Sequence, residues 1–349
     1  MSTSPLRVLV IDDSAYNRRK IAEMLESSRD IEVIGKAGDG EEALRLATSL
    51  RPDVITLDLE MPRMDGFTFL RILMAKQPTP VIVVSSYAQK ENVFKALELG
   101  ALDFVAKPDR RILDDGDELR QKLISKVSMV RNLRLVAKPA EPTLPPAPLP
   151  FEKVAQPGGA PRHIVVVAAS TGGPTAVLEI FAHLPPTLPI AVLVAQHMPE
   201  KFTRTFAERL DRRSGLQVRE AQDLDAVLAH TGFVCPGRQC MELAPSAYGG
   251  ELRVRVLPPH PGDRYVPSAD RLFRSAAKVA GNQVTGIVLT GMGDDGTEGA
   301  RAIREAGGTV IAESQESAVV YGMPGSVIRA GLANRILPLP EIAEYVAAL

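Results

Sequence analysis

The chain has 349 residues, of which 45% are hydrophobic and 24% charged, and its 41 Lys and Arg residues nearly balance its 42 Asp and Glu residues. These values are typical of a soluble globular protein with material for two domains, and the lack of a basic excess argues against nucleic-acid binding. The apolar runs are too short to span a bilayer, no signal peptide is evident, and two cysteines cannot build a disulfide framework. We therefore expect a cytoplasmic protein without membrane insertion.

Five short apolar runs alternate with amphipathic segments in the N-terminal part. The runs are rich in Val and Ile, which is typical of strands buried on both faces of a parallel sheet. The expected strands cover 6–12, 31–37, 53–59, 80–86 and 103–108, and the expected helices cover 14–28, 40–50, 65–76, 90–99 and 115–134. This alternation predicts a doubly wound α/β domain.

Acidic residues follow the first and third of these strands, namely Asp12, Asp13 and Asp58. In the common strand order 2-1-3-4-5, these two strand ends are neighbours, so the carboxylates should converge. Close carboxylates need a cation, and oxygen ligands select a hard ion such as Mg²⁺. Asp58 could then attack a phosphoryl donor, with Ser85 and Lys107 at later strand ends stabilising the phosphoryl oxygens. A single Asp at such a position is usually a cap or turn residue, so the prediction depends on the whole set.

Over about residues 5–126 the chain resembles the receiver domain of two-component response regulators. The segments VLVIDDSAYNRR, DVITLDLEMPRMDG, PVIVVSSY and GALDFVAKP match that family's blocks in order. The resemblance implies a flavodoxin-like fold in which Asp58 is the phosphoacceptor. It also implies a magnesium site made by Asp13, Asp58 and the backbone carbonyl of Glu60, with Asp12 helping through water.

The same resemblance implies a switch built from a hydroxyl, a rotating aromatic ring and a lysine. The residues at these positions are Ser85, Phe104 and Lys107. The Lys107–Pro108 peptide would be cis, a conformation whose cost is tolerable only before proline.

A proline-rich stretch follows this part of the chain. From Lys138 to Pro161, eight of the 24 residues are proline. Such a composition favours extended polyproline II and excludes the interior of a helix or sheet. We expect a receiver domain at 5–126, a linker at 127–161 and a second domain at 162–349.

The second domain again alternates apolar runs and amphipathic segments, with a less regular middle between 214 and 260. Its expected strands cover 163–169, 189–195, 231–236, 251–257, 284–290 and 308–312, and its expected helices cover 173–184, 200–213, 269–280, 297–306, 325–330 and 339–348. The predicted fold class is therefore two doubly wound, mainly parallel α/β domains joined by a Pro-rich linker.

Three strands of the second domain end in residues that suit nucleophilic catalysis. Ser170 follows the first strand, His197 follows the second, and Asp294 and Asp295 lie in the Gly-rich loop after VTGIVLT. Together they fit a nucleophile, a general base and an orienting acid. Taken alone, Ser170 could be a helix cap and His197 a structural residue. The GxSxG motif of ordinary α/β-hydrolases and the phosphate-binding glycine motifs are absent.

Residues 162–349 resemble the catalytic domain of the chemotaxis protein-glutamate methylesterases. The matching blocks are ASTGGP, AQHMP, RYVPSADRLF, LTGMGDDGTEGA and YGMPGSV. The resemblance implies a Rossmann-like fold, with Ser170 as nucleophile, His197 as general base and Asp295 as the residue that orients the histidine. It also implies that Thr171 and Met292 shape the oxyanion region.

Both resemblances together predict a phosphorylation-activated serine hydrolase for chemotactic adaptation. It would demethylate γ-glutamyl methyl esters on chemoreceptor helices, release methanol, deamidate receptor glutamines, and need no cofactor for ester hydrolysis. A chemotaxis histidine kinase would phosphorylate Asp58, and the unphosphorylated receiver would cover the active site. A signalling module without chemistry is the main alternative, and the set of Ser170, His197 and Asp295 argues against it. A transcriptional regulator would need a basic DNA-binding effector, which the sequence lacks.

Overall fold

The computed structural model describes the chain apart from residues 1–3, 87–89, 108–115, 134–157 and 247–249. It divides into two compact units, Met1–Thr143 and Leu144–Leu349. Most of the expected Pro-rich linker lies outside the described residues, and so does Pro108 of the expected cis peptide. Within the described part of the chain, we find no helix that is both long and apolar enough to cross a membrane.

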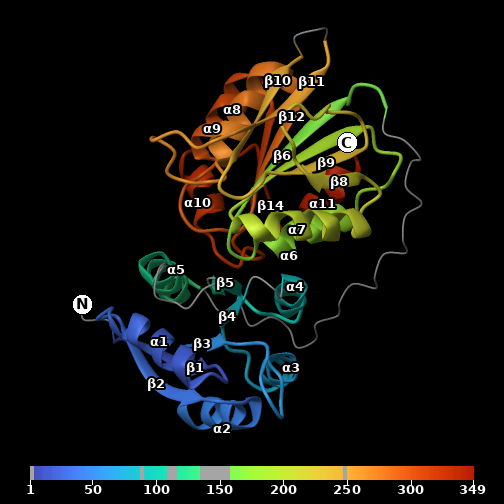
Figure 1. The fold of residues 1–349 in the computed structure, drawn as a ribbon. Coiled ribbons are helices and arrows are strands. Elements are labelled where there is room, and N and C mark those ends of the chain that lie inside the picture. The colour runs from blue at the N-terminus through green and yellow to red at the C-terminus, as the bar shows by residue number, and fades with distance from the viewer. Residues whose placement is uncertain (1–3, 87–89, 108–115, 134–157, 247–249) are drawn as a thin grey trace. The chain divides into compact units, whose positions relative to one another are not determined.

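The N-terminal unit is built on a five-stranded parallel sheet (Figure 1). Its strands are β1 (Leu6–Ile11), β2 (Ile31–Ala37), β3 (Val54–Leu57), β4 (Val81–Ser86) and β5 (Asp103–Lys107), and its helices are α1 (Ala15–Glu26), α2 (Gly40–Leu50), α3 (Gly66–Lys76), α4 (Lys90–Glu98) and α5 (Gly116–Ser128). The strand order is β2-β1-β3-β4-β5, as predicted. Helices α1 and α5 pack together, as do α2 and α3.

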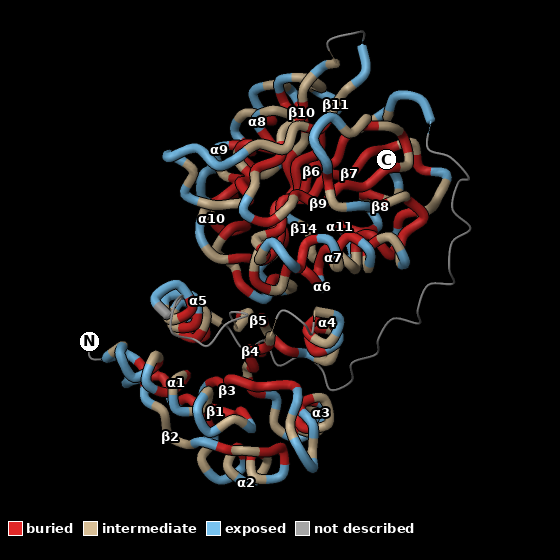
Figure 2. The backbone as a smooth tube through the Cα atoms, viewed as in Figure 1, coloured by how far each residue is buried: buried red, intermediate tan, exposed pale blue. Residues whose placement is uncertain are grey.

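Burial follows the Val- and Ile-rich pattern of the strands, which form the buried centre of each unit (Figure 2). Ser14, Asp39 and Asp65 cap α1, α2 and α3 by accepting hydrogen bonds from backbone N–H groups of the first helical turn. The packed part of the unit continues past residue 126. Val127 and Val130 are buried in its core, and the short helix η2 (Met129–Asn132) follows α5 directly. The packed helices α5 and η2 thus extend past residue 126, where we expected the first domain to end.

The C-terminal unit has a seven-stranded parallel sheet. Its strands in chain order are β6 (His163–Ala169), β7 (Ile190–Gln196), β8 (Gln217–Glu220), β9 (Thr231–Val234), β12 (Val284–Val288), β13 (Thr309–Glu313) and β14 (Arg335–Leu337). Its spatial order is β14-β13-β12-β6-β7-β9-β8. Its helices are α6 (Gly173–Ala182), α7 (Glu200–Arg213), α8 (Ala269–Ala280), α9 (Thr297–Glu305), α10 (Met323–Arg329) and α11 (Leu339–Ala347), with a short helix η3 (Gly281–Gln283) before β12. Helices α6, α7 and α11 lie on one side of the sheet and α8, α9 and α10 on the other (Figure 1).

The structure adds short strands that the sequence did not predict. Strands β8 and β14 have only four and three residues, too few to give a clear pattern. The expected strand at 251–257 forms, as β11 (Leu252–Leu257), but it pairs antiparallel with β10 (Cys240–Pro245) outside the main sheet. The alternation of apolar residues and arginines in β11 fits this position, because one face of the ribbon packs on the core and the other meets water.

Candidate functional site

Two adjacent strand ends bring Ser170 and His197 together. Ala169, the last residue of β6, pairs in register with Gln196, the last residue of β7. Ser170 and His197 therefore directly follow the ends of two neighbouring strands. The buried Gln196 side chain links the two turns, because its Nε2 donates to the carbonyl oxygens of Ser170 at 2.9 Å and His197 at 3.1 Å. The adjacency predicted from the sequence is therefore present in the backbone itself.

The turn that carries Ser170 is held by Thr290, at the end of the neighbouring strand β12. The Ser170 N–H donates to the Thr290 carbonyl oxygen at 3.0 Å, and the Thr290 hydroxyl donates to the Thr171 carbonyl oxygen at 2.9 Å. Gly291 follows Thr290, and a Cβ there would lie 2.7 Å from the Ser170 Cβ. Only a glycine leaves the serine side chain this space.

A buried carboxyl group supports Thr290 from the other side. Glu313, at the end of β13, is 1% exposed; its Oε2 accepts from the Thr290 N–H at 2.7 Å and its Oε1 from the Ser317 hydroxyl at 2.9 Å. Burial raises the pKa of Glu313 above its ordinary value. Glu313 therefore contributes to the position of the Ser170 turn through a single intervening residue.

The histidine contacts the second of the two adjacent acids. His197 Nε2 donates to Asp295 Oδ2 over 2.8 Å, and Asp295 is 1% exposed. Three backbone N–H groups also donate to this carboxylate, at 2.8–3.1 Å, from Ala269, Asp270 and Gly296. Both carboxylate oxygens are thus hydrogen-bonded, which fixes the orientation of the carboxylate that holds one edge of the imidazole.

Asp294 has different partners and lies closer to solvent. Its carboxylate accepts from the Tyr265 hydroxyl at 2.9 Å and from Arg264 at 3.1 Å. The Tyr265 hydrogen bond, assisted by the charge of Arg264, lowers the pKa of Asp294. The Tyr265 ring stacks on the His197 ring, with centroids 5.3 Å apart and planes inclined by 7°. Asp294 therefore binds the tyrosine that stacks on the histidine.

The two residues expected near an oxyanion lie beside the serine turn. Thr171 is buried directly after Ser170. Met292 is half-buried and follows Gly291, and its N–H has no protein acceptor within the described part of the chain. A backbone N–H that has no acceptor within the protein is suited to bind the oxygen of a substrate.

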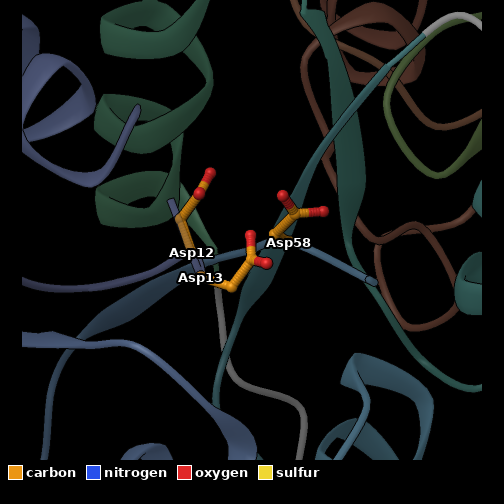
Figure 3. Close-up of side chains that lie close together, drawn as sticks. All are labelled: Asp12, Asp13 and Asp58. Carbon is orange, nitrogen blue, oxygen red and sulfur yellow. The ribbon is translucent and has the colours of Figure 1, made fainter. Parts of the chain in front are cut away.

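A second cluster lies at the ends of β1 and β3 in the N-terminal unit. The carboxyl groups of Asp12, Asp13 and Asp58 gather there, with one oxygen of each within 4.8 Å of the others (Figure 3). Lys107 Nζ donates to Asp12 Oδ2 at 2.8 Å and also contacts Asp58 Oδ2. Burial raises the pKa of Asp12. Burial also opposes the charge of Lys107, but the carboxylates of Asp58 and Asp12 outweigh it and raise the pKa of the lysine.

The donor set of this cluster fits a hard divalent cation. It offers three carboxylates, two of them buried, at the carboxyl edge of a parallel sheet. Glu60 lies two residues after Asp58, and its N–H donates to Asp58 Oδ1 at 3.3 Å. Ser85 is buried at the end of β4, opposite Ala106 in the register of β5, and Phe104 is buried within β5.

Sequence reasoning assigned no role to Gln196, Thr290, Glu313 or Tyr265. Gln196 and Thr290 directly follow apolar runs, as Ser170 does, and that position is the only signal the sequence offers. The contact between Tyr265 and His197 joins residues 68 positions apart and depends on the loop before α8.

Comparisons with known proteins agree with this geometry. The family model for the CheB methylesterase matches residues 165–346, and the model for the response regulator receiver domain matches residues 8–115. The chain is 47% identical to protein-glutamate methylesterase/protein-glutamine glutaminase 1 of Myxococcus xanthus, with 100% of this chain and 98% of that protein covered. It is 50% identical to protein-glutamate methylesterase/protein-glutamine glutaminase 6 of Anaeromyxobacter dehalogenans, with 97% and 93% covered.

A solved structure matches the C-terminal unit. The crystal structure of the CheB methylesterase catalytic domain of Thermotoga maritima is 37% identical, with a TM-score of 0.52. The match covers 55% of this chain and 99% of that one.

Proposed function

The chain belongs to the CheB methylesterase family and carries a response regulator receiver domain, and on this premise we propose that it is a phosphorylation-activated protein-glutamate methylesterase. Its substrates are γ-glutamyl methyl esters on chemoreceptor helices, and methanol is the product. The observation that carries the proposal is the 2.8 Å hydrogen bond between His197 and Asp295, with Ser170 next to His197 in the strand register. The names of the relatives support a second activity at the same site, the deamidation of receptor glutamines.

The hydrogen bond also supports an assignment of the imidazole nitrogen that acts as the base. Because His197 Nε2 donates to Asp295, the lone pair lies on Nδ1. Nδ1 takes the proton from the Ser170 hydroxyl as Oγ attacks the ester carbonyl carbon. The same nitrogen then returns the proton to the departing methoxy group, so that methanol leaves and a glutamyl ester of Ser170 remains. Water, deprotonated by His197, hydrolyses this ester and restores the enzyme.

Backbone donors stabilise the negative oxygen that forms during both steps. We assign this role to the turn after Ser170 and to Met292, whose N–H is available among the described residues. Thr171 supports the turn, because its carbonyl oxygen is tied to Thr290. No metal is required for this chemistry.

In the receiver domain, Asp58 is the proposed site of phosphorylation. Asp12, Asp13 and Asp58, with the backbone carbonyl of Glu60, would hold Mg²⁺, which supplies positive charge against the phosphoryl oxygens. Lys107 would bind the same oxygens, and the contact of its Nζ with Asp58 supports this role. Ser85 and Phe104 are the proposed switch residues that respond to the phosphoryl group.

The packing supports a proposal for the domain limits. We propose a receiver from residue 5 to about 133, extended beyond 126 because α5 and η2 pack in its core, then a linker to residue 161 and a catalytic domain at 162–349. A chemotaxis histidine kinase is the proposed phosphodonor. Since the substrate glutamates lie on cytoplasmic receptor helices, the proposed location of the enzyme is the cytoplasm.

A fluorophosphonate ester tests the nucleophile directly, because it phosphonylates an activated serine and stays attached. We expect one label per chain, on Ser170 by peptide mass spectrometry, and none in Ser170→Ala. His197→Ala should label far more slowly, because the serine loses its base. Labelling of another serine with Ser170 unmodified would contradict the assignment.

A further inference from the structure

We propose that Tyr265 is a positioning residue for the general base, and that Asp294 holds Tyr265 in place. The inference rests on the proposed role of His197. It gives a function to Tyr265 and Asp294, which have no role in the triad or the oxyanion region. The observation behind it is the parallel stack between the Tyr265 and His197 rings.

The stack restrains a motion that the triad leaves open. The hydrogen bond from His197 Nε2 to Asp295 fixes one edge of the imidazole, but the ring can still tilt about that bond. Tyr265 lies against the face of the imidazole, with the two planes inclined by only 7°. A ring packed against a face in offset parallel contact opposes the tilt. Asp295 and Tyr265 therefore restrain the imidazole in two different directions, which would hold Nδ1 in the orientation that the proposed base needs.

Tyr265 is itself held on three sides. Its hydroxyl donates to Asp294 Oδ1 at 2.9 Å, and the Arg264 guanidinium, which binds the other oxygen of Asp294, lies 5.5 Å from the Tyr265 ring centroid. Gly293 gives the ring its space, because a Cβ there would lie 2.3 Å from the Tyr265 hydroxyl oxygen. Three consecutive residues thus act on His197. Asp295 binds the edge of its ring, whereas Gly293 and Asp294 position the tyrosine that packs on its face.

The stack also favours the charged state that the reaction creates. When His197 takes the Ser170 proton, the imidazole becomes a cation. The face of a tyrosine ring attracts a cation, so the contact is stronger in the transition state than in the resting enzyme. Loss of the ring should therefore lower kcat more than it raises KM.

The experiment compares full-length variants on methylated chemoreceptor membranes with a small-molecule phosphodonor. Tyr265→Leu, which removes the flat ring, should lower kcat about ten- to hundredfold with KM changed less than about threefold, as expected for a misaligned base. Tyr265→Phe keeps the ring and should keep activity within about fivefold of wild type. Tyr345→Leu is the matched control, because this tyrosine lies on α11 with its ring against Arg335. It should behave as wild type.

A second measurement does not depend on turnover. The Nε2–H proton of His197, visible by nuclear magnetic resonance through its hydrogen bond to Asp295, should exchange with water faster in Tyr265→Leu than in wild type or Tyr265→Phe. If Tyr265→Leu does not fold, Tyr265→Met replaces it, because methionine fills the space without a flat face.

The outcomes separate this inference from the function on which it rests. Wild-type kcat and wild-type proton exchange in Tyr265→Leu, with His197→Ala inactive, would overturn the role of Tyr265 and leave the triad intact. Full activity in His197→Ala would instead overturn the proposed function. An equal loss of kcat in Tyr265→Phe and Tyr265→Leu would show that the hydroxyl, not the ring, matters, and would also overturn the inference.

Discussion

Asp294 and Asp295 are neighbours in the chain, yet within the described residues their carboxylates share no hydrogen-bond donor. Asp295 is buried and binds His197. Asp294 binds Tyr265 and Arg264, and its side chain is 47% exposed. Gly296, which has a φ of 91°, follows both residues and caps the start of α9. The consequence is that the same substitution at the two positions should have very different effects.

Asp295→Asn should lower kcat by orders of magnitude. Both carboxylate oxygens accept hydrogen bonds from N–H donors. In the asparagine variant, the side-chain NH₂ group would replace one oxygen and would face either the His197 donor or the backbone donors. In serine proteases the equivalent change lowers kcat about 10⁴-fold, because the wrong imidazole tautomer is held. Asp294→Asn keeps an oxygen for the Tyr265 hydroxyl and should lose less than about tenfold. The kcat values of both variants on one methylated receptor preparation decide the matter, and an inactive Asp294 variant beside an active Asp295 variant would reverse the assignment.

Ser170→Ala and His197→Ala should each nearly abolish turnover, because they remove the nucleophile and its base. Their effects should not add in the double variant, since the residues act as a unit. Circular dichroism of each variant is the control for folding. Substantial methanol release by the folded Ser170→Ala protein would exclude an acyl-enzyme on this residue.

Acetyl phosphate with Mg²⁺ should phosphorylate Asp58, because the carboxylates and Lys107 meet at this strand end. The Asp58→Asn variant should not be phosphorylated, and acetyl phosphate should not increase its ester hydrolysis, but it should keep the basal rate. The matched control is Asp53→Asn, which lies just before β3, where Asp58 lies just after it. The protein has no Trp, so intact-protein mass spectrometry replaces the usual fluorescence assay. A phosphoryl group retained in Asp58→Asn would refute the assignment.

A fragment of residues 160–349 should fold, because the C-terminal unit has its own core. It should also hydrolyse receptor esters faster than the unphosphorylated full-length protein, since the receiver would no longer restrict access. Initial rates at equal enzyme concentration measure this. A folded fragment with equal or lower activity would show that the receiver does not restrain the catalytic domain by covering it.

Glu313 should make the stability of this fragment depend on pH. Burial raises its folded pKa above the ordinary value of 4.5, so the folded state binds the proton more tightly than the unfolded state. The contribution of Glu313 to stability is therefore greatest below pH 4.5 and falls as pH rises from there through the folded pKa. Relative to Glu313→Gln, the wild-type free energy of unfolding should fall by at most about 1.4 kcal/mol per pH unit in that window. Urea unfolding of both proteins at several pH values measures the difference, and parallel pH curves would contradict the prediction.

The sequence predicted the parts of the fold that periodicity controls. The strand order of the first sheet follows from five βα units, and the buried strands β6, β7 and β12 were found because they are continuous apolar runs. Strands β8 and β14 were missed because pairing with neighbours, rather than their own pattern, makes them strands. The strand at 251–257 was found, but its place in a separate ribbon depends on its partner β10.

The site was predictable to the extent that its residues follow strands. Ser170, His197 and Asp295 follow β6, β7 and β12, whose carboxyl ends meet at one edge of the sheet. The choice between Asp294 and Asp295 came from the family motif, and the structure gives it a physical basis in the donors around each carboxylate. Tyr265 and Glu313 act through contacts between distant segments, and no spacing rule in one sequence reveals such contacts.

The sharpest test of the proposed function is methanol release from methylated chemoreceptor membranes, with and without acetyl phosphate and Mg²⁺. We expect release by the wild-type protein that increases with the phosphodonor, release without that increase by Asp58→Asn, and none by Ser170→Ala. No methanol from the wild-type protein, or equal release by Ser170→Ala, would contradict the proposed function.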